Sequence, residues 1–257
     1  MRVATKYQMD TLRERLVSVV RADWPETLED WVRYRAELSA IKRMHKASDP
    51  TGFTIDRGLI EDHLPEPASL VRFARDFDVP AVLPIAYYTL AGLSRYTDWD
   101  TIHAGQPLVA IGPGDRTLSA RWPLLDTLDL KIIMRLKEML ATRTASIVDT
   151  YCGEVALGQL ARELKMSHPM CDTPTRCLDE MRRLTTKWRE EDFEVHDVLQ
   201  YVQCPDPLNV LQKLYNTHTT WKLCRGCDGR LQKHITDAQV ALWEQIRMMV
   251  DIFERSP

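Results

Sequence analysis

The stretch LDTLDLKIIMRLKEMLATRTASI, residues 125–147, decides the fold class. Its apolar side chains recur mostly at intervals of three or four residues, which is the spacing of one face of an α-helix. They are Leu125, Leu128, Ile132, Leu136, Leu140 and Ile147. Asp126 or Thr127 is placed to cap the N-terminus. The stretch therefore predicts a helix of about 22 residues with one buried side.

Similar spacing extends through most of the chain. Four segments before this stretch and four after it show the pattern of a helix with an apolar face. They are residues 10–24, 27–41, 67–77 and 81–96, then 156–165, 177–188, 208–215 and 236–253, the last with Thr236 as its cap. Only 10 of 257 residues are glycine, which also favours helices. We expect an all-α protein, an irregular helical domain of about eight or nine helices.

Residues 97–123 interrupt the helical pattern. Glycines and prolines are concentrated there, and it is the longest stretch without helical spacing. They are Gly105, Pro107, Gly112, Pro113 and Gly114. We therefore expect a long irregular middle connection at 97–123, which separates a first part at 1–96 from a C-terminal helical region at 124–257.

Composition excludes several classes of function. The 34 basic and 37 acidic side chains give 34 − 37 = −3, so a polybasic nucleic-acid binder is not expected. Hydrophobic residues make up 44% and charged residues 28%, as in soluble globular domains. The longest apolar run, residues 79–93, contains two prolines and is too short to span a membrane. The first residues contain no apolar signal segment, and we expect an intracellular protein of the cytoplasm or nucleus.

Six cysteines are the most distinctive side chains. They are Cys152, Cys171, Cys177, Cys204, Cys224 and Cys227. A reducing compartment disfavours a disulfide framework, whereas the C-x-x-C spacing of Cys224 and Cys227 is that of a zinc knuckle. Cys171 and Cys177 are the leading candidates for the two further ligands, and Cys204, His218 and His234 are alternatives. The sequence predicts one structural zinc ion held by Cys171, Cys177, Cys224 and Cys227.

Two other interpretations of the cysteines stay open. The C-x-x-C pair is also found in redox proteins, although no βαβ pattern surrounds it here. Cys177 lies on the apolar face of its own predicted helix, where a thiol packs as a small hydrophobic group.

Motifs of catalysis are missing or incomplete. Gly153 and Gly158 have Walker A spacing, but Gln159 and Leu160 follow where a lysine and a hydroxyl are required. No G-x-S-x-G motif supplies a nucleophile. We therefore expect no catalytic and no organic-cofactor-binding residues, and a protein that is not an enzyme.

Several short motifs resemble those of a known family. Residues 4–9, ATKYQM, with Leu12 are similar to the final helices of a BTB/POZ domain. Later motifs resemble the region after the BTB domain in a large set of basidiomycete BTB proteins. They are DWP at 23–25, Trp31, LPEPA at 64–68, DVP at 78–80, LPIAYY at 83–88, LCRGC at 223–227 and Trp243. The resemblance covers nearly the whole chain and makes residues 1–96 the end of a BTB-like domain with the first post-BTB helices.

This resemblance implies a non-catalytic protein–protein interaction module, an adaptor or scaffold. By resemblance alone, a cullin-type ligase is the implied partner. The β-rich first part of a BTB domain is missing from the sequence, as in a truncated chain or a paralogue that has lost its dimerisation module, and this departure argues against a BTB-type homodimer. One alternative is a thiol-dependent redox protein or enzyme that uses Cys224 or Cys227. Another is a zinc-stabilised, transcription-linked binding protein with a basic cluster. Its members are Arg182, Arg183, Lys187 and Arg189.

Overall fold

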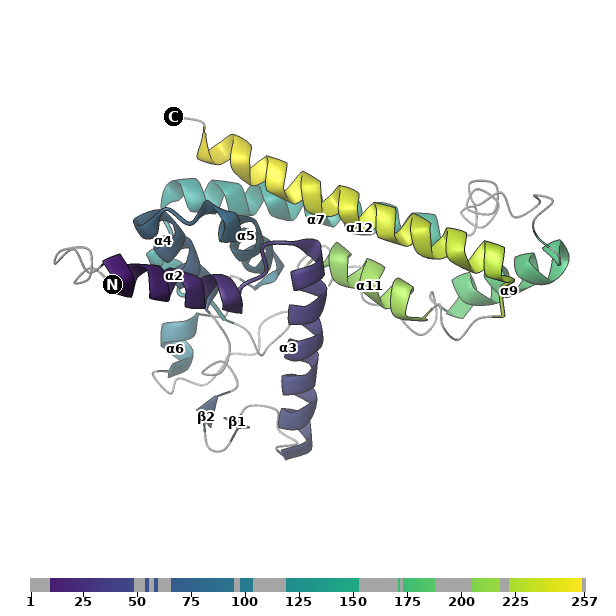
Figure 1. Ribbon diagram of the computed structural model, residues 1–257, viewed down its shortest axis with the longest axis horizontal. Coiled ribbons are helices and arrows are strands. Elements are labelled where there is room, and N and C mark those ends of the chain that lie inside the picture. The colour runs from purple at the N-terminus through teal and green to yellow at the C-terminus, as the bar shows by residue number, and fades with distance from the viewer. Residues whose placement is uncertain are drawn as a thin grey trace. The chain divides into compact units, whose positions relative to one another are not determined.

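A computed structural model describes most of the chain. The described residues are 10–48, 54–55, 58–59, 66–94, 98–103, 119–152, 171, 173–187, 205–217 and 222–255. They form nine α-helices: α2 (Asp10–Asp23), α3 (Leu28–Ser48), α4 (Pro67–Phe77), α5 (Leu83–Gly92), α6 (Trp99–His103), α7 (Thr127–Cys152), α9 (Pro174–Lys187), α11 (Pro207–Thr217) and α12 (Arg225–Glu254) (Figure 1). The prediction of an all-α protein is confirmed.

Other regular structure in these ranges is short. Two antiparallel strands of two residues each, β1 (Thr54–Ile55) and β2 (Gly58–Leu59), form a small hairpin. Single 3₁₀ turns, η2 (Pro80–Val82) and η3 (Trp122–Leu124), precede α5 and α7. None of the described helices combines the length and the apolar composition that a membrane span requires.

The chain divides into two compact units. Unit 1 comprises Met1–Leu136 and Ile246–Pro257, and unit 2 comprises Lys137–Gln245, so that α7 and α12 each contribute to both. The division predicted from the sequence, with its connection at 97–123, stays a prediction. Within that stretch the structure places the short helix α6, and residues 104–118 lie outside the described residues.

The helices of unit 1 begin where side chains can satisfy free backbone N–H groups. The Thr27 hydroxyl accepts from the N–H of Asp30 at 3.1 Å at the start of α3. The Glu66 carboxylate accepts from the N–H groups of Ala68 and Ser69 at 2.8 and 2.6 Å at the start of α4, where Pro67 fills the first helical position. Glu66 also accepts from the N–H of Arg121 at 3.0 Å, which fixes the segment before α7.

The apolar core of unit 1 is built on α4 and α5. Val71 and Ile85 are almost completely buried, and α5 is apolar on all sides. Trp31 of α3 packs edge-on against Tyr88 with 6.5 Å between ring centroids. Each such side chain contributes about 1.5–3 kcal/mol through its removal from water. Helix α2 buries no residue, and it is attached through the Arg13 guanidinium, which donates to the Phe77 carbonyl at 2.7 Å.

A network of charged and polar side chains lies at the edge of this core, with Tyr87 and Asp129 as its buried members. Arg75 of α4 contacts carboxylate oxygens of Asp126, Asp129 and Glu254 at 3.0, 2.9 and 2.8 Å. The Tyr87 hydroxyl of α5 donates to Asp129 at 2.6 Å, and both side chains are fully buried. Burial raises the pKa of Tyr87 and of Asp129. The network therefore ties α4, α5 and α7 to the end of α12 with each buried group paired.

Helix α7 confirms the first sequence prediction. It starts at Thr127 with Asp126 as its cap, since the N–H of Asp129 donates to Asp126 at 2.9 Å and the N–H of Asp126 donates to Asp129 at 2.8 Å. Ile132, Leu136 and Leu140 are fully buried, as the apolar spacing predicts.

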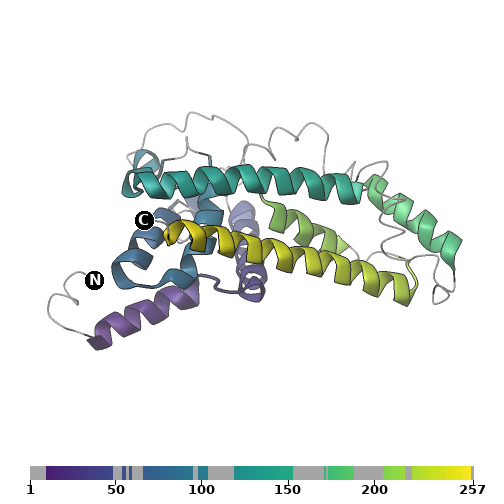
Figure 2. The same cartoon turned by 90° about the horizontal axis from the view of Figure 1, so that it is seen from above.

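Unit 2 is organised around the part of α12 that belongs to it, which runs beside α7 and α11 (Figure 2). The Tyr151 hydroxyl of α7 lies 2.7 Å from Nδ1 of His234. The Gln239 amide donates to Gln212 of α11 at 3.0 Å. Helix α12 thus makes one polar contact with α7 and one with α11 in addition to its apolar packing.

The predicted start of the last helix at Thr236 is wrong. Helix α12 begins at Arg225, and the N–H of Asp228 already donates to the carbonyl of Cys224 at 2.9 Å. Thr236 lies in mid-helix, where a threonine is tolerated. The C-x-x-C motif therefore lies at the start of α12, with Cys224 directly before the helix and Cys227 in its first turn.

Candidate metal centre

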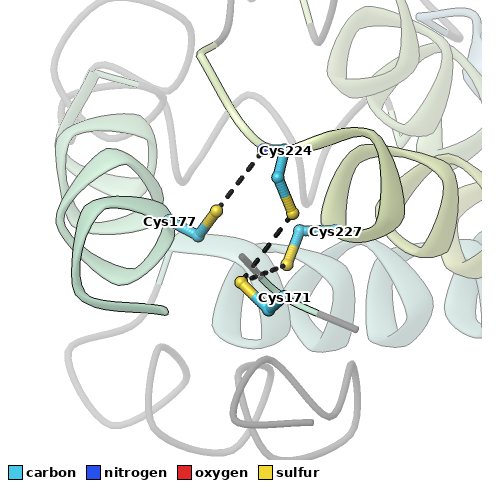
Figure 3. A group of neighbouring side chains, drawn as sticks. All are labelled: Cys171, Cys177, Cys224 and Cys227. Atoms are coloured by element: carbon cyan, nitrogen blue, oxygen red, sulfur yellow. Dashed lines mark hydrogen bonds between the residues drawn. The ribbon is translucent and has the colours of Figure 1, made fainter. Parts of the chain in front are cut away.

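Four cysteines of unit 2 converge at the N-terminal ends of two helices. Cys177 lies in the first turns of α9, and Cys171 precedes that helix. Cys224 directly precedes α12, and Cys227 lies in its first turn. Their sulfur atoms point toward one another (Figure 3). Two pairs that are distant in sequence thus meet because each stands at the start of a helix.

The four sulfur atoms lie close enough together to hold one metal ion. All four Sγ atoms lie within 4.8 Å of one another. Cys171 Sγ is 3.8 Å from Cys224 Sγ and 3.6 Å from Cys227 Sγ. A zinc–sulfur bond of about 2.3 Å requires an edge of about 3.8 Å in a tetrahedron of four sulfurs. A disulfide would require about 2.05 Å. These four cysteines are free thiols in the structure.

The surroundings of the cluster supply hydrogen-bond donors to sulfur. The backbone N–H of Cys224 donates to Cys177 Sγ at 3.4 Å. The Arg230 guanidinium donates to Cys227 Sγ at 3.6 Å, and the Thr173 hydroxyl lies 3.8 Å from Cys177 Sγ. Donors of this kind and a nearby cation stabilise thiolates, the form in which cysteine binds metals.

The four thiols differ in exposure and acidity. Cys177 and Cys227 are completely buried, Cys171 is 6% exposed, and Cys224 is only partly buried. Burial raises the pKa of Cys171, and it raises that of Cys227 to about 12. Burial acts in the same direction on Cys224, but the backbone N–H of Cys227 and the neighbouring thiols outweigh it and lower the pKa of Cys224 to about 7. Of Cys171, Cys224 and Cys227, Cys224 therefore ionises most readily.

This arrangement can bind a soft divalent metal such as zinc. Four sulfurs would fill all four tetrahedral positions, which is typical of structural zinc sites, whereas catalytic sites keep one position for water or substrate. The net charge of a zinc ion with four thiolates is about −2, and Arg230 lies where it offsets part of that charge.

The other ligands considered from the sequence are not part of the cluster as described. His234 lies on α12 and is hydrogen-bonded to Tyr151. Cys204 and His218 lie outside the described residues. In the basic cluster of α9, Arg182 pairs with Asp179 at 3.1 Å and Arg183 pairs with Glu180 at 2.7 Å, and Arg189 is also outside the described ranges.

Sequence reasoning missed the side chains that support the sulfurs. Arg230 follows Cys227 by three residues, the spacing at which two side chains meet on a helix. This contact can be predicted only if the helix is known to start at Arg225, because the predicted start lay further along the chain. Thr173 precedes Cys177 by four residues, and its carbonyl accepts from the N–H of Cys177 at 3.0 Å. Its placement follows from the start of α9.

Comparisons with protein-family models, curated proteins and solved structures find no match to this chain. The resemblance to BTB proteins therefore depends only on the motifs quoted above.

Proposed function

We propose that this chain is a zinc-stabilised, non-catalytic helical module that binds other proteins. The observation that carries the proposal is the closed set of four cysteine sulfurs within 4.8 Å. Because all four coordination positions would be filled by the protein, the ion would be structural and not catalytic. It would join the start of α9 to the start of α12.

A second contact at the same place supports a structural task. The N–H of Lys222 donates to the Glu180 carboxylate at 3.1 Å. Glu180 lies three residues after Cys177 on α9. Glu180 also pairs with Arg183, and this hydrogen bond lowers the pKa of Glu180. The segment that carries Cys224 is thus bound to α9 by both sulfur and carboxylate.

The lining of one surface cavity among the described residues bears on the non-catalytic part of the proposal. A cavity of about 360 Å³ lies at the turn between α2 and α3, and no cysteine or histidine lines it. Four of its charged side chains form pairs, Arg21 with Glu26 at 2.6 Å and Arg33 with Asp30 at 2.7 Å. Trp24 and Tyr34 stack at 5.9 Å. Such paired groups are not arranged for acid–base or nucleophilic chemistry.

The adaptor role and the cullin-type partner rest on the family resemblance. In this proposal the helical units display surfaces, and the zinc ion keeps one of them in a single conformation. An intracellular location suits free thiols that bind zinc.

Metal analysis of the purified full chain tests the zinc. We expect one zinc ion per chain, and a large loss of helical circular dichroism and of melting temperature when a chelator removes it. The matched control is Cys224→Ser with Cys227→Ser, which should contain no zinc and should not respond to the chelator. A chain that contains no metal and whose melting temperature does not change when zinc is added would show that the thiols do not form a structural zinc site.

Direct binding to a purified cullin N-terminal region tests the partner. Binding by the zinc-loaded chain and its loss in the double serine variant would support the adaptor role. Absence of binding by the zinc-loaded chain would remove the cullin-type ligase from the proposal and leave the structural zinc standing.

A further inference from the structure

Resting on the zinc site proposed above, we infer that the four-cysteine cluster is also a redox-sensitive switch, in which a hydroperoxide oxidises Cys224, a disulfide forms between Cys224 and Cys171, and zinc leaves. The inference is carried by the unequal exposure of the four thiols and by the two sulfur–sulfur contacts of Cys171.

Access selects the first thiol to react. Cys224 is the partly exposed member of the cluster, whereas Cys177 and Cys227 have no exposed surface and Cys171 is 6% exposed. Cys224 also precedes α12, so its side chain lies at the edge of the helix end. Oxidation of cysteine follows exposure and thiolate character. A peroxide from solvent therefore meets Cys224 before the others.

A direct sulfur–sulfur contact points to the partner thiol. Cys171 Sγ lies 3.8 Å from Cys224 Sγ, and Cys171 belongs to a short segment before α9 and not to a helix interior. The two sulfurs must approach to about 2.05 Å to form a disulfide, which the movement of a non-helical residue allows. Cys177 instead accepts the backbone N–H of Cys224 and sits on the fully buried face of α9 with Met181.

Burial protects the other candidate. Cys227 is only 3.6 Å from Cys171, so distance alone would favour a disulfide between those two. Cys227 has no exposed surface, however, so a peroxide from solvent reaches it more slowly than it reaches Cys224.

The reaction balances in two steps. The Cys224 sulfur attacks one peroxide oxygen, the O–O bond breaks, and the departing oxygen takes a proton from solvent as water or an alcohol. Cys171 sulfur then attacks Cys224 sulfur, the S–S bond forms, and the oxygen on Cys224 leaves as hydroxide, which solvent protonates to water. Two thiolates lose two electrons in total and the peroxide gains them. Zinc, left with two sulfur ligands, is released.

The consequence is a coupling between oxidation and structure. The ion joins the start of α9 to the start of α12, so its loss would release both helix ends. A thiol reductant would reverse the disulfide and restore the site, because a disulfide is a reversible stage of cysteine oxidation.

The test uses the full chain loaded with one zinc ion per molecule, with zinc content measured first. Hydrogen peroxide is added, zinc release is followed with a coloured zinc indicator, and the disulfides are mapped by mass spectrometry. We expect release of one zinc per chain, a Cys171–Cys224 disulfide, and recovery of zinc binding after a phosphine reductant. A main disulfide that involves Cys152, Cys204 or Cys227, or release without any disulfide, would overturn the inference.

Two matched variants sharpen the test. Cys224→His and Cys227→His each leave three thiolates and one imidazole, a ligand set that also holds structural zinc. We expect peroxide-driven zinc release to be slowed at least about tenfold in Cys224→His and to be slowed much less in Cys227→His. Equal rates in the two variants would overturn the inference. If either variant fails to bind zinc, mapping of the unmodified chain decides alone.

The two proposals fail in different ways. A purified chain that takes up no zinc refutes the structural zinc site before any peroxide is added. A chain that holds one zinc ion and keeps it at peroxide concentrations that oxidise a free cysteine peptide refutes only the switch.

Discussion

Unit 1 and unit 2 are stabilised by different means. Unit 1 has an apolar core on α4 and α5 and, beside it, a network in which Arg75 neutralises the buried Asp129 carboxylate, so that every component is covalently part of the chain. In unit 2 the starts of α9 and α12 meet at four thiols, whose mutual placement could hold a metal ion such as zinc. If the proposed zinc is bound, we expect unit 1 to be stable without metal and unit 2 to need the ion.

Removal of zinc gives the largest expected effect, and it tests whether unit 1 and unit 2 differ in their dependence on a metal ion. Structural zinc contributes about 10–16 kcal/mol of apparent binding free energy in small zinc domains at neutral pH, and in this chain it should act on unit 2. After chelation we expect amide hydrogen exchange to accelerate strongly in α9 and at the start of α12. Protection should persist in α4 and α5. Equal acceleration in α5 and α9 would show that the two units do not differ in this way.

Loss of Arg75 gives the next largest effect and tests unit 1. Arg75→Met removes the cation and leaves Asp129, whose side chain is fully buried, without its charged partner. Breaking a buried ion pair in this way costs about 3–5 kcal/mol. Urea unfolding of the zinc-loaded chain should show the loss in unit 1.

A matched control is the neighbouring arginine of α4. Arg72 pairs with Asp76 at 3.8 Å, and both side chains are 40% exposed. Arg72→Met should therefore change the free energy of unfolding by less than about 1 kcal/mol. A loss as large as that of Arg75→Met would show that charge on α4, and not the buried network, stabilises unit 1.

The sequence predicted α7 well for a physical reason. Residues 125–147 carry an apolar face long enough for local spacing to determine the helix, and Asp126 supplies a cap that depends only on its neighbours. Asp129 shows what spacing alone overlooks. It lies four residues after Leu125 and three before Ile132, hence on the buried face, and that position was a readable sign that a buried partner exists. Which partner it has, Tyr87 or Arg75, depends on tertiary contacts.

The metal site depends less on local sequence signals than α7 does, and more on tertiary contacts. The C-x-x-C spacing of Cys224 and Cys227 is a local signal, and it identified one half of the cluster. Pairing with Cys171 and Cys177, about fifty residues earlier, was a choice among several cysteines and histidines, and the structure brings these two to the site. The start of α12 was missed because glycines at 226 and 229 argue against a helix there, and tertiary contacts at its first turn override that preference.

A buried hydroxyl in unit 2 gives a smaller expected effect. Tyr151 is 2% exposed and its hydroxyl contacts His234 at 2.7 Å. Tyr151→Phe keeps the ring and removes this hydrogen bond, and we expect a loss of about 0.5–1.5 kcal/mol in chemical unfolding with zinc bound. If this variant destabilised unit 2 as much as chelation does, the thiols would not be its principal support.

The smallest effect concerns one charge at the edge of the unit 1 network. Asp126 contacts Arg75 and is 51% exposed, and the backbone N–H of Asp129 together with Arg75 lowers the pKa of Asp126. A carboxylate with a lowered pKa in the folded state adds stability above its unfolded pKa of about 3.9, and this contribution is lost as the pH falls through the folded value. Asp126→Asn keeps the capping oxygen and removes the charge, so it should cost about 0.2–1 kcal/mol at pH 7.

The pH dependence separates charge from capping in this last variant. As the pH falls through the lowered pKa of Asp126, the wild-type carboxyl becomes protonated, and the stability difference from Asp126→Asn should shrink toward zero, as measured by urea unfolding from pH 7 down into the acid range. Asp129 acts with the opposite sign, since its pKa is raised by burial and its penalty disappears as the pH falls, but it is present in both proteins and cancels in the difference. A difference that is constant with pH would mean that Asp126 acts through its hydrogen bond to the start of α7, and that Arg75 draws its stabilising effect from the buried partners alone.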